Sequence, residues 1–154
     1  MIRIIGIGSP FGDDAAGLEA AQQLSIAPPP DTEVVVADRP GAALIDLFDG
    51  ADAVILIDAA RSGAPAGTVH DLDLRTRTLH AIGVVSSHDL GVSAALGLAA
   101  TLGRLPSYGR VLGIEASEAS RASITPDVRT GVSVAVKRAR EWCATYRSRS
   151  EHPY

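Results

Sequence analysis

The apolar residues of this chain fall into short continuous runs that alternate with longer stretches at helical spacing. Residues 2–7, 34–36 and 53–57 are short runs rich in Ile and Val, typical of strands buried on both faces of a parallel sheet. Between these runs, residues 15–24 repeat apolar side chains with the period of a helix, and residues 41–48 can form a short second helix. This alternation predicts an α/β fold.

The second half of the chain continues the pattern. Residues 68–74 alternate apolar and polar side chains and predict an edge strand, which we expect to be antiparallel. A serine cap opens a helix expected over residues 86–102, and residues 108–114 predict another strand. Thr125-Pro126-Asp127 is a strong start signal for a last helix, because Thr can cap the helix and Pro suits its first position.

Together these elements predict a three-layer α/β/α sandwich. Its sheet is expected to be twisted and mostly parallel, with about five strands and one antiparallel edge strand. Right-handed crossovers would place a functional crevice at the carboxyl ends of the strands. A length of 154 residues suits one domain, which we assign to residues 1–147, with a frayed tail over residues 148–154.

Composition narrows the class of protein. The formal net charge is −4 and no dense cluster of Lys and Arg precedes the C-terminal stretch, which argues against a nucleic-acid partner. Cys143 is the only cysteine, so no intrachain disulfide can form and a reducing compartment fits best. The N-terminus lacks the pattern of a signal peptide, and the apolar residues 90–102 are too few to cross a bilayer. We therefore expect a cytoplasmic protein without membrane insertion.

Three residues with metal-binding side chains are expected at one edge of the sheet. Asp14 follows the first strand, Asp58 ends the third, and His88 opens the helix that begins near residue 86. Two carboxylates and one imidazole suit a divalent ion such as nickel or zinc. Spacing alone leaves ordinary roles open: a helix cap for Asp13 or Asp14, a turn for Asp58, and a first-turn polar residue for His88.

From end to end, the motifs of this chain resemble those of the nickel–iron hydrogenase maturation proteases. The first strand and acidic pair match the family's opening motif in Gly6-Ile7-Gly8-Ser9-Pro10-Phe11-Gly12-Asp13-Asp14-Ala15-Ala16-Gly17. The middle acid follows in Ile55-Leu56-Ile57-Asp58-Ala59, and the histidine block in Ser86-Ser87-His88-Asp89-Leu90-Gly91. Further along, Gly113-Ile114-Glu115 and Ile124-Thr125-Pro126-Asp127-Val128 resemble the family's later strand and the start of its last helix.

The resemblance implies an endopeptidase that removes a C-terminal extension from the nickel-loaded precursor of a hydrogenase large subunit. It implies that Asp14, Asp58 and His88 bind the metal, with nickel supplied by the precursor. Zinc or cadmium could occupy the same site. Cleavage would then require a neutral His88 and ionised acids.

The chain departs from the family pattern at two places. Ser9 stands where the family usually has Asn, in a first loop one residue shorter than usual. Arg39-Pro40-Gly41 stands where it tends to have two glycines followed by Thr or Ser. Because this second loop follows a strand end, we take Asp38 as a candidate substrate-recognition residue, with a plain turn-forming role as the alternative.

Two other functions are compatible with parts of this sequence. The chain carries no H-E-x-x-H or G-x-S-x-G motif, so a non-catalytic metal-dependent chaperone of hydrogenase assembly is one alternative. A dinucleotide-binding module is the other, because Gly6 and Gly8 follow a strand and Asp38 ends the next one. Against the second, Phe11 replaces the third Gly of that fingerprint, and an acidic pair lies where a helix would receive pyrophosphate.

Overall fold

A single five-stranded sheet forms the centre of the protein, whose computed structural model describes residues 1–75, 91–117 and 122–151. The strands lie in the order β2-β1-β3-β5-β4. Their bounds are β1 (Ile2–Gly8), β2 (Thr32–Asp38), β3 (Ala53–Ala60), β4 (Val69–Asp73) and β5 (Tyr108–Glu115). Four strands are parallel and β4 pairs antiparallel with β5 at one edge, which confirms the predicted sheet.

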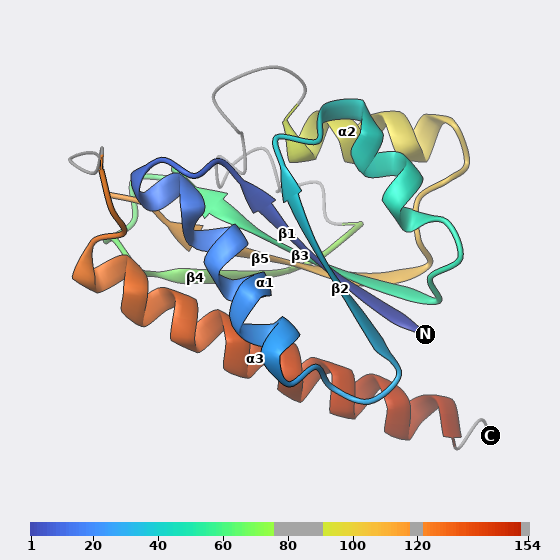
Figure 1. Ribbon diagram of the computed structural model, residues 1–154. Coiled ribbons are helices and arrows are strands. Elements are labelled where there is room, and N and C mark those ends of the chain that lie inside the picture. Colours follow the sequence, from blue (N-terminus) through green and yellow to red (C-terminus); the bar gives the residue numbers. More distant parts are fainter. Residues whose placement is uncertain (76–90, 118–121, 152–154) are drawn as a thin grey trace.

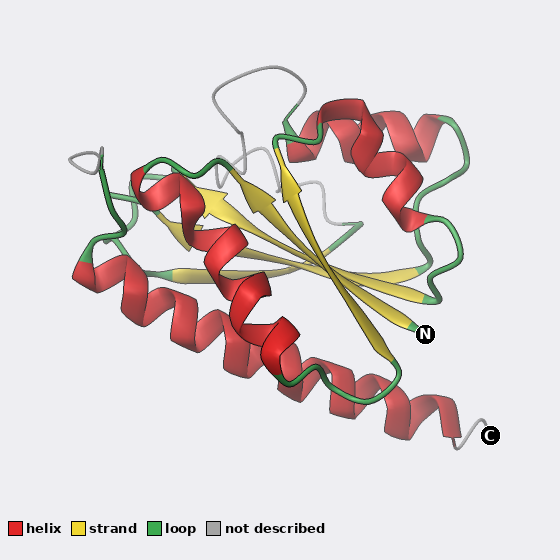
Figure 2. Cartoon of the chain, in the orientation of Figure 1, coloured by secondary structure: helices red, strands yellow, loops and turns green. Residues whose placement is uncertain are grey.

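Helices cover both faces of the sheet, so the predicted three-layer sandwich is confirmed (Figure 1). The helical elements are η1 (Gly12–Ala15), α1 (Ala16–Ile26), η2 (Gly41–Phe48), α2 (Val92–Thr101) and α3 (Pro126–Glu151), of which η1 and η2 are 3₁₀-helices. Side chains of α1 and α3 share one hydrophobic core, and those of η2 and α2 share the other. Figure 2 shows the strands lying between these two helical layers.

Alternation along each strand divides the apolar residues between the two cores. In β3, Val54 and Leu56 pack against η2 and α2, whereas Ile55 and Ile57 pack against α1 and α3. All eight residues of β3 are buried, because the strand lies in the middle of the sheet with helices on both sides. The continuous apolar run in the sequence therefore reflects burial on two faces.

The elements differ from the predicted ones mainly at their ends. Strand β3 continues past Asp58, since residues 58–60 pair with residues 113–115 of β5. Helix α2 has Gly91 as its N-cap residue, so the prediction of a helix that continues from residue 86 is wrong. The tail predicted from residue 148 is helical as far as Glu151. The preceding turn of α3 is held by the partly buried ring of Tyr146 and by the bond from Arg147 Nη1 to the carbonyl of Pro30 (3.1 Å).

The chain changes sides of the sheet between β1 and β3. It passes from β1 to β2 through α1 on one face, and from β2 to β3 through η2 on the other face. In α/β folds a ligand-binding crevice is expected beside such a change of side, at the carboxyl ends of the strands. Helix α2 is followed by residues 102–107 and then by the start of β5, so its C-terminal end lies toward the amino ends of the strands. The N-terminal end of α2 therefore points toward the carboxyl edge.

None of the helices within the described ranges is both long enough and apolar enough to span a membrane.

Candidate functional site

Asp58 is a buried carboxylate near the carboxyl end of β3, with only 1% of its surface exposed. Its Oδ1 accepts a hydrogen bond from the backbone N–H of Ala59 at 2.8 Å. Its Oδ2 is fully buried and has no hydrogen-bond partner in the part of the chain that the structure describes. Buried polar atoms are normally paired, so this carboxylate oxygen is a candidate for binding a ligand or an ion.

The surroundings of Asp58 disfavour its charged form. Burial is the largest influence, and together with the nearby negative charge of Asp14 it raises the pKa of Asp58 to about 8. The hydrogen bond from Ala59 and the positive charge of Arg61 act in the opposite direction and lower it in part. A carboxyl group with this pKa holds a proton at neutral pH until a cation replaces it.

Asp14 lies in η1, the 3₁₀ turn that follows β1. Its Oδ2 accepts a hydrogen bond from Ser9 Oγ at 2.5 Å, and its backbone carbonyl accepts one from the N–H of Ser9 at 3.3 Å. Its negative charge contributes to the raised pKa of Asp58, so the two carboxylates lie within range of electrostatic interaction. Ser9, which departs from the family pattern, is thus the direct partner of a predicted ligand.

Two glycines allow this close packing. A Cβ atom on Gly17 would lie 2.2 Å from the carbonyl oxygen of Ile7 and 2.3 Å from that of Ile57, so the first turn of α1 rests directly on the ends of β1 and β3. A Cβ atom on Gly8 would lie 2.1 Å from the carbonyl oxygen of Asp14. The glycines around the acidic pair therefore fix η1 against the crevice.

The same geometry argues against the dinucleotide-binding alternative. In that motif the second glycine makes room for the pyrophosphate of the ligand. Here Gly8 makes room for the carbonyl of Asp14, and the turn before α1 carries the acidic side chains of Asp13 and Asp14. A phosphate approaching this helix start would meet negative charge.

Asp38 ends β2 at the same edge of the sheet, where it pairs in register with Gly8. Its side chain is exposed and forms an ion pair with the neighbouring Arg39, whose Nε lies 2.7 Å from Oδ1. Arg39 has a left-handed backbone (φ 44°), and its N–H donates to the carbonyl of Gly8 at 2.9 Å. The structure therefore places this candidate recognition loop beside the β1 end of the crevice.

The third predicted ligand, His88, lies outside the described residues. Asp58 follows Val54 and Leu56 at intervals of two along β3, so its side chain points to the face covered by α2. His88 precedes by three residues the N-cap of α2, the helix on that same face. Within the described ranges, no three His, Cys, Asp or Glu side chains form a metal-binding group.

Two buried acids at the carboxyl edge were not predicted as functional residues. Asp13 is 1% exposed and Glu115 is 2% exposed. Asp13 bonds to the segment that leads from β5 to α3, and Glu115 bonds to the loop that follows β3. In the sequence, only their positions within two motifs that resemble the family pointed to these acids. Their bonding partners are about 50 to 110 residues away in the chain, so the contacts themselves could not be inferred.

The Glu115 cluster contains Ser, His and an acid but lacks the geometry of a nucleophilic triad. Ser62 Oγ and Glu115 Oε2 both face the same ring nitrogen of His70, Nε2, at 3.3 and 3.1 Å. In a triad the acid binds the opposite ring nitrogen, which leaves Nε2 free to take the serine proton. Ser62 Oγ instead donates to Glu115 at 3.0 Å, so the cluster holds the loop and does not activate a nucleophile.

Glu115 stabilises this loop as an anion. Burial would raise its pKa, but hydrogen bonds from His70, from Ser62 Oγ and from the backbone N–H groups of Ser62 and Gly63 outweigh burial and lower it. The backbone bonds are short, at 2.7 and 2.9 Å. Because the folded pKa lies below the unfolded one, the stabilisation is present above the unfolded pKa of Glu, about 4.3, and is lost as pH falls through the folded pKa.

Replacing Glu115 by Gln is expected to lower the free energy of unfolding at pH 7 by about 1–3 kcal/mol, because the charged acceptor of several buried bonds is lost. Urea unfolding monitored by circular dichroism measures this change. In the acid range the wild-type protein should lose stability faster than the variant as pH falls below about 4. Equal stability at pH 7 would show that the bonds to Ser62 and His70 contribute nothing.

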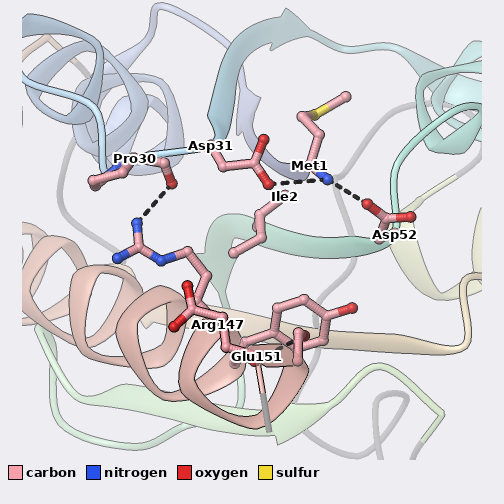
Figure 3. Close-up of a pocket in the computed structure, with 9 residues that line it drawn as sticks. Met1, Ile2, Pro30, Asp31, Asp52, Arg147 and Glu151 are labelled. Carbon is pink, nitrogen blue, oxygen red and sulfur yellow. Dashed lines mark hydrogen bonds and ion pairs between the residues drawn. The ribbon is translucent and has the colours of Figure 1, made fainter. Parts of the chain in front are cut away.

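Neither Cys143 nor the pocket in Figure 3 belongs to the crevice. Cys143 lies on the buried face of α3, and burial raises the pKa of its thiol. The pocket lies among residues at the amino ends of the strands, including Met1, Asp31 and Asp52 (Figure 3). There the terminal ammonium of Met1 forms ion pairs with both acids, at the opposite end of the sheet from Asp58.

Comparisons with known proteins agree in pointing to hydrogenase maturation proteins. Residues 20–142 match the family model described as hydrogenase maturation protease. The chain is 28% identical over 152 residues to the hydrogenase expression/formation protein HupD of Thiocapsa roseopersicina, covering 94% of this chain and 68% of that protein.

Solved structures of similar fold include the hydrogenase maturating endopeptidase HybD from E. coli, with a TM-score of 0.71 at 24% identity over 90% of this chain and 88% of that one. The [NiFe] hydrogenase maturation protease HycI from Thermococcus kodakarensis KOD1 has a TM-score of 0.68 at 22% identity, over 91% and 90% of the two chains. These likenesses confirm the fold of the sheet and its helical layers.

Proposed function

This chain belongs to the hydrogenase maturation protease family and is therefore a hydrogenase maturation endopeptidase; on this premise we propose that it removes a C-terminal extension from the nickel-loaded precursor of a hydrogenase large subunit. Nickel already bound in the precursor is the recognition signal. Asp14, Asp58 and His88 bind that nickel and so position a nearby peptide bond for cleavage. The reaction takes place in the cytoplasm.

The observation that carries this proposal is the buried Oδ2 of Asp58 near the carboxyl end of β3, which has no hydrogen-bond partner among the residues that the structure describes. Burying a carboxylate oxygen without a partner is costly in a folded protein, and metal coordination would satisfy it. The neighbouring carboxylate of Asp14 supplies a second hard oxygen donor and more negative charge. The start of α2, which follows His88 in the chain, points toward the same edge of the sheet.

In this arrangement the chain's own residues bind and orient the substrate. Two carboxylates and one imidazole leave coordination positions on the nickel for groups of the precursor, so the metal serves as a template that joins the two proteins. Ser9 fixes one oxygen of Asp14, and the backbone N–H of Ala59 fixes one oxygen of Asp58. Asp38 and Arg39, at the end of β2, then lie where they can contact the precursor beside the nickel.

Incubation of the purified chain with a hydrogenase large-subunit precursor is expected to give a shorter subunit only when the precursor contains nickel. Gel mobility and mass spectrometry of the released peptide measure the reaction and identify the cut position. A precursor loaded with zinc in place of nickel is the matched control. Binding without trimming would support the non-catalytic chaperone instead, and equal trimming of the nickel-free precursor would contradict the proposed role of the metal.

A further inference from the structure

Asp13, the other member of the acidic pair, makes contacts of a different kind from those of Asp14. Its Oδ1 accepts a hydrogen bond from the backbone N–H of Thr125 at 2.7 Å, and its Oδ2 accepts one from the N–H of Ser117 at 2.8 Å. The hydroxyl of Thr125 lies 3.1 and 3.0 Å from the two oxygens. Both oxygens of Asp13 are therefore engaged by the segment between β5 and α3.

These contacts do not correspond to the ordinary role of an acid before a helix. A capping acid accepts bonds from the first backbone N–H groups of its own helix. In the described residues no cap residue of η1 or α1 makes such a side-chain bond, and the partners of Asp13 lie 104 and 112 residues further along the chain. Asp13 thus joins the turn after β1 to the start of α3.

The bonds of Asp13 to Ser117 and Thr125 restrict the position of Asp14, the next residue in the chain. Asp13 and Asp14 are neighbours within a four-residue 3₁₀ turn, so holding the side chain of Asp13 in the core restricts the backbone from which Asp14 projects. Ser9 holds the carbonyl and the carboxylate of Asp14 from the other side. The carbonyl of Asp14 also packs closely against Gly8, where a Cβ atom would lie 2.1 Å from it, so the turn rests directly on the end of β1.

From this geometry we infer that Asp13 is a positioning residue for the metal-binding carboxylate of Asp14, acting through its bonds to Ser117 and Thr125. This inference rests on the proposed function, because it takes Asp14 as a nickel ligand. The two members of the acidic pair therefore have separate roles. Asp13 accepts hydrogen bonds from the protein and orients Asp14, whereas Asp14 binds nickel. Residues that hold a metal ligand in place commonly change metal affinity when they are altered.

The test measures Ni²⁺ binding by isothermal titration calorimetry at pH 8, well below the melting temperature of each variant. Asp13→Asn places an amide group against backbone donors and is expected to weaken Ni²⁺ binding about 10–100-fold. Thr125→Val removes only the hydroxyl contact and should weaken binding by a smaller factor, whereas Thr125→Ser, which keeps the hydroxyl, should bind as the wild type does. A purely structural role would lower the melting temperature and leave the affinity unchanged.

Unchanged Ni²⁺ affinity in a folded Asp13→Asn variant would overturn the inference. If that variant does not fold, equal affinities of Thr125→Val and Thr125→Ser overturn it instead. Asp14→Asn tests the underlying function separately. Wild-type affinity in Asp14→Asn, or no Ni²⁺ binding by the wild-type chain, would contradict the proposed nickel site and with it the inference. Weakened binding in Asp14→Asn together with unchanged binding in Asp13→Asn would overturn only the role of Asp13.

Discussion

Replacing Asp58 by Asn is expected to abolish trimming of the precursor while making the folded protein more stable at neutral pH. The loss of activity follows from the loss of a charged ligand at the centre of the crevice. Since altering a residue that only supports a ligand costs about 10–100-fold, removing the ligand itself should reduce trimming by more than about 100-fold. The expected gain in stability reflects a common trade-off, in which a buried charged group that is needed for function lowers the stability of the folded protein.

The gain in stability follows from the direction of the pKa change. Asp58 has a folded pKa of about 8, above its unfolded value of 3.8, so the unfolded chain releases this proton first as pH rises. The folded state is therefore penalised increasingly between about pH 4 and pH 8, by roughly 4 kcal/mol at pH 7. Asn removes this penalty but leaves its own buried amide N–H unpaired, at a cost of about 1–3 kcal/mol.

We expect a net rise in melting temperature of about 3–8 °C for Asp58→Asn at pH 7.5, measured by calorimetry without added metal. The rise should disappear below about pH 4, as Asp58 becomes protonated in the unfolded state as well as in the folded one. Asp31→Asn is the matched control, because Asp31 is exposed and lies at the amino end of the strands. Normal trimming by the Asp58→Asn variant would show that Asp58 is not part of the site. A lower melting temperature of this variant would show that burial of the Asp58 carboxylate does not destabilise the folded protein.

The affinity of the metal-free chain for Ni²⁺ is expected to rise about 100-fold between pH 6 and pH 8 and then to level off. Below its pKa of about 8, Asp58 must release a proton before it binds the ion, which contributes about tenfold per pH unit. His88 must also be neutral, so trimming should fade further as pH falls through the range where an ordinary histidine takes up a proton. Calorimetry at several pH values, in buffers of different ionisation enthalpy, measures both the affinity and the released protons.

Asp58→Asn provides the control for this pH dependence. Any Ni²⁺ binding that remains in the variant should lack the tenfold slope between pH 7 and pH 8. Affinity that is independent of pH in the wild type, or trimming that continues unchanged well into acid, would contradict the involvement of a protonated Asp58 and of His88.

Much of the fold could be predicted because local signals agreed with the final structure. The apolar runs of β1 and β3 are continuous since both strands are buried on two faces, and Thr125-Pro126-Asp127 marks the start of α3 at Pro126 as expected. The end of β3 was predicted too early, because its last residues are held by pairing with β5 and not by their own apolar pattern. The start of α2 was predicted too early because a serine pair is only a weak local cap signal.

The site could be predicted only in part. The order of strands explains why Asp14, Asp38 and the end of β3 reach one edge, since each follows a parallel strand. The burial of Asp58, and the lack of a hydrogen-bond partner for its Oδ2 among the described residues, could not be inferred from the sequence, because they depend on how the helices pack on the sheet. The roles of Asp13 and Glu115 were missed for the same reason: their partners are distant in the chain and meet only in the folded protein.

A crystal structure of the chain with bound Ni²⁺, or with Cd²⁺ as a heavier substitute, would show whether Asp14, Asp58 and His88 share one metal ion. We expect one anomalous-scattering peak at the carboxyl edge, within bonding distance of carboxylate oxygens of Asp14 and Asp58 and of a ring nitrogen of His88. A metal bound elsewhere, or a refined position of His88 too far from the two acids to share an ion with them, would contradict it.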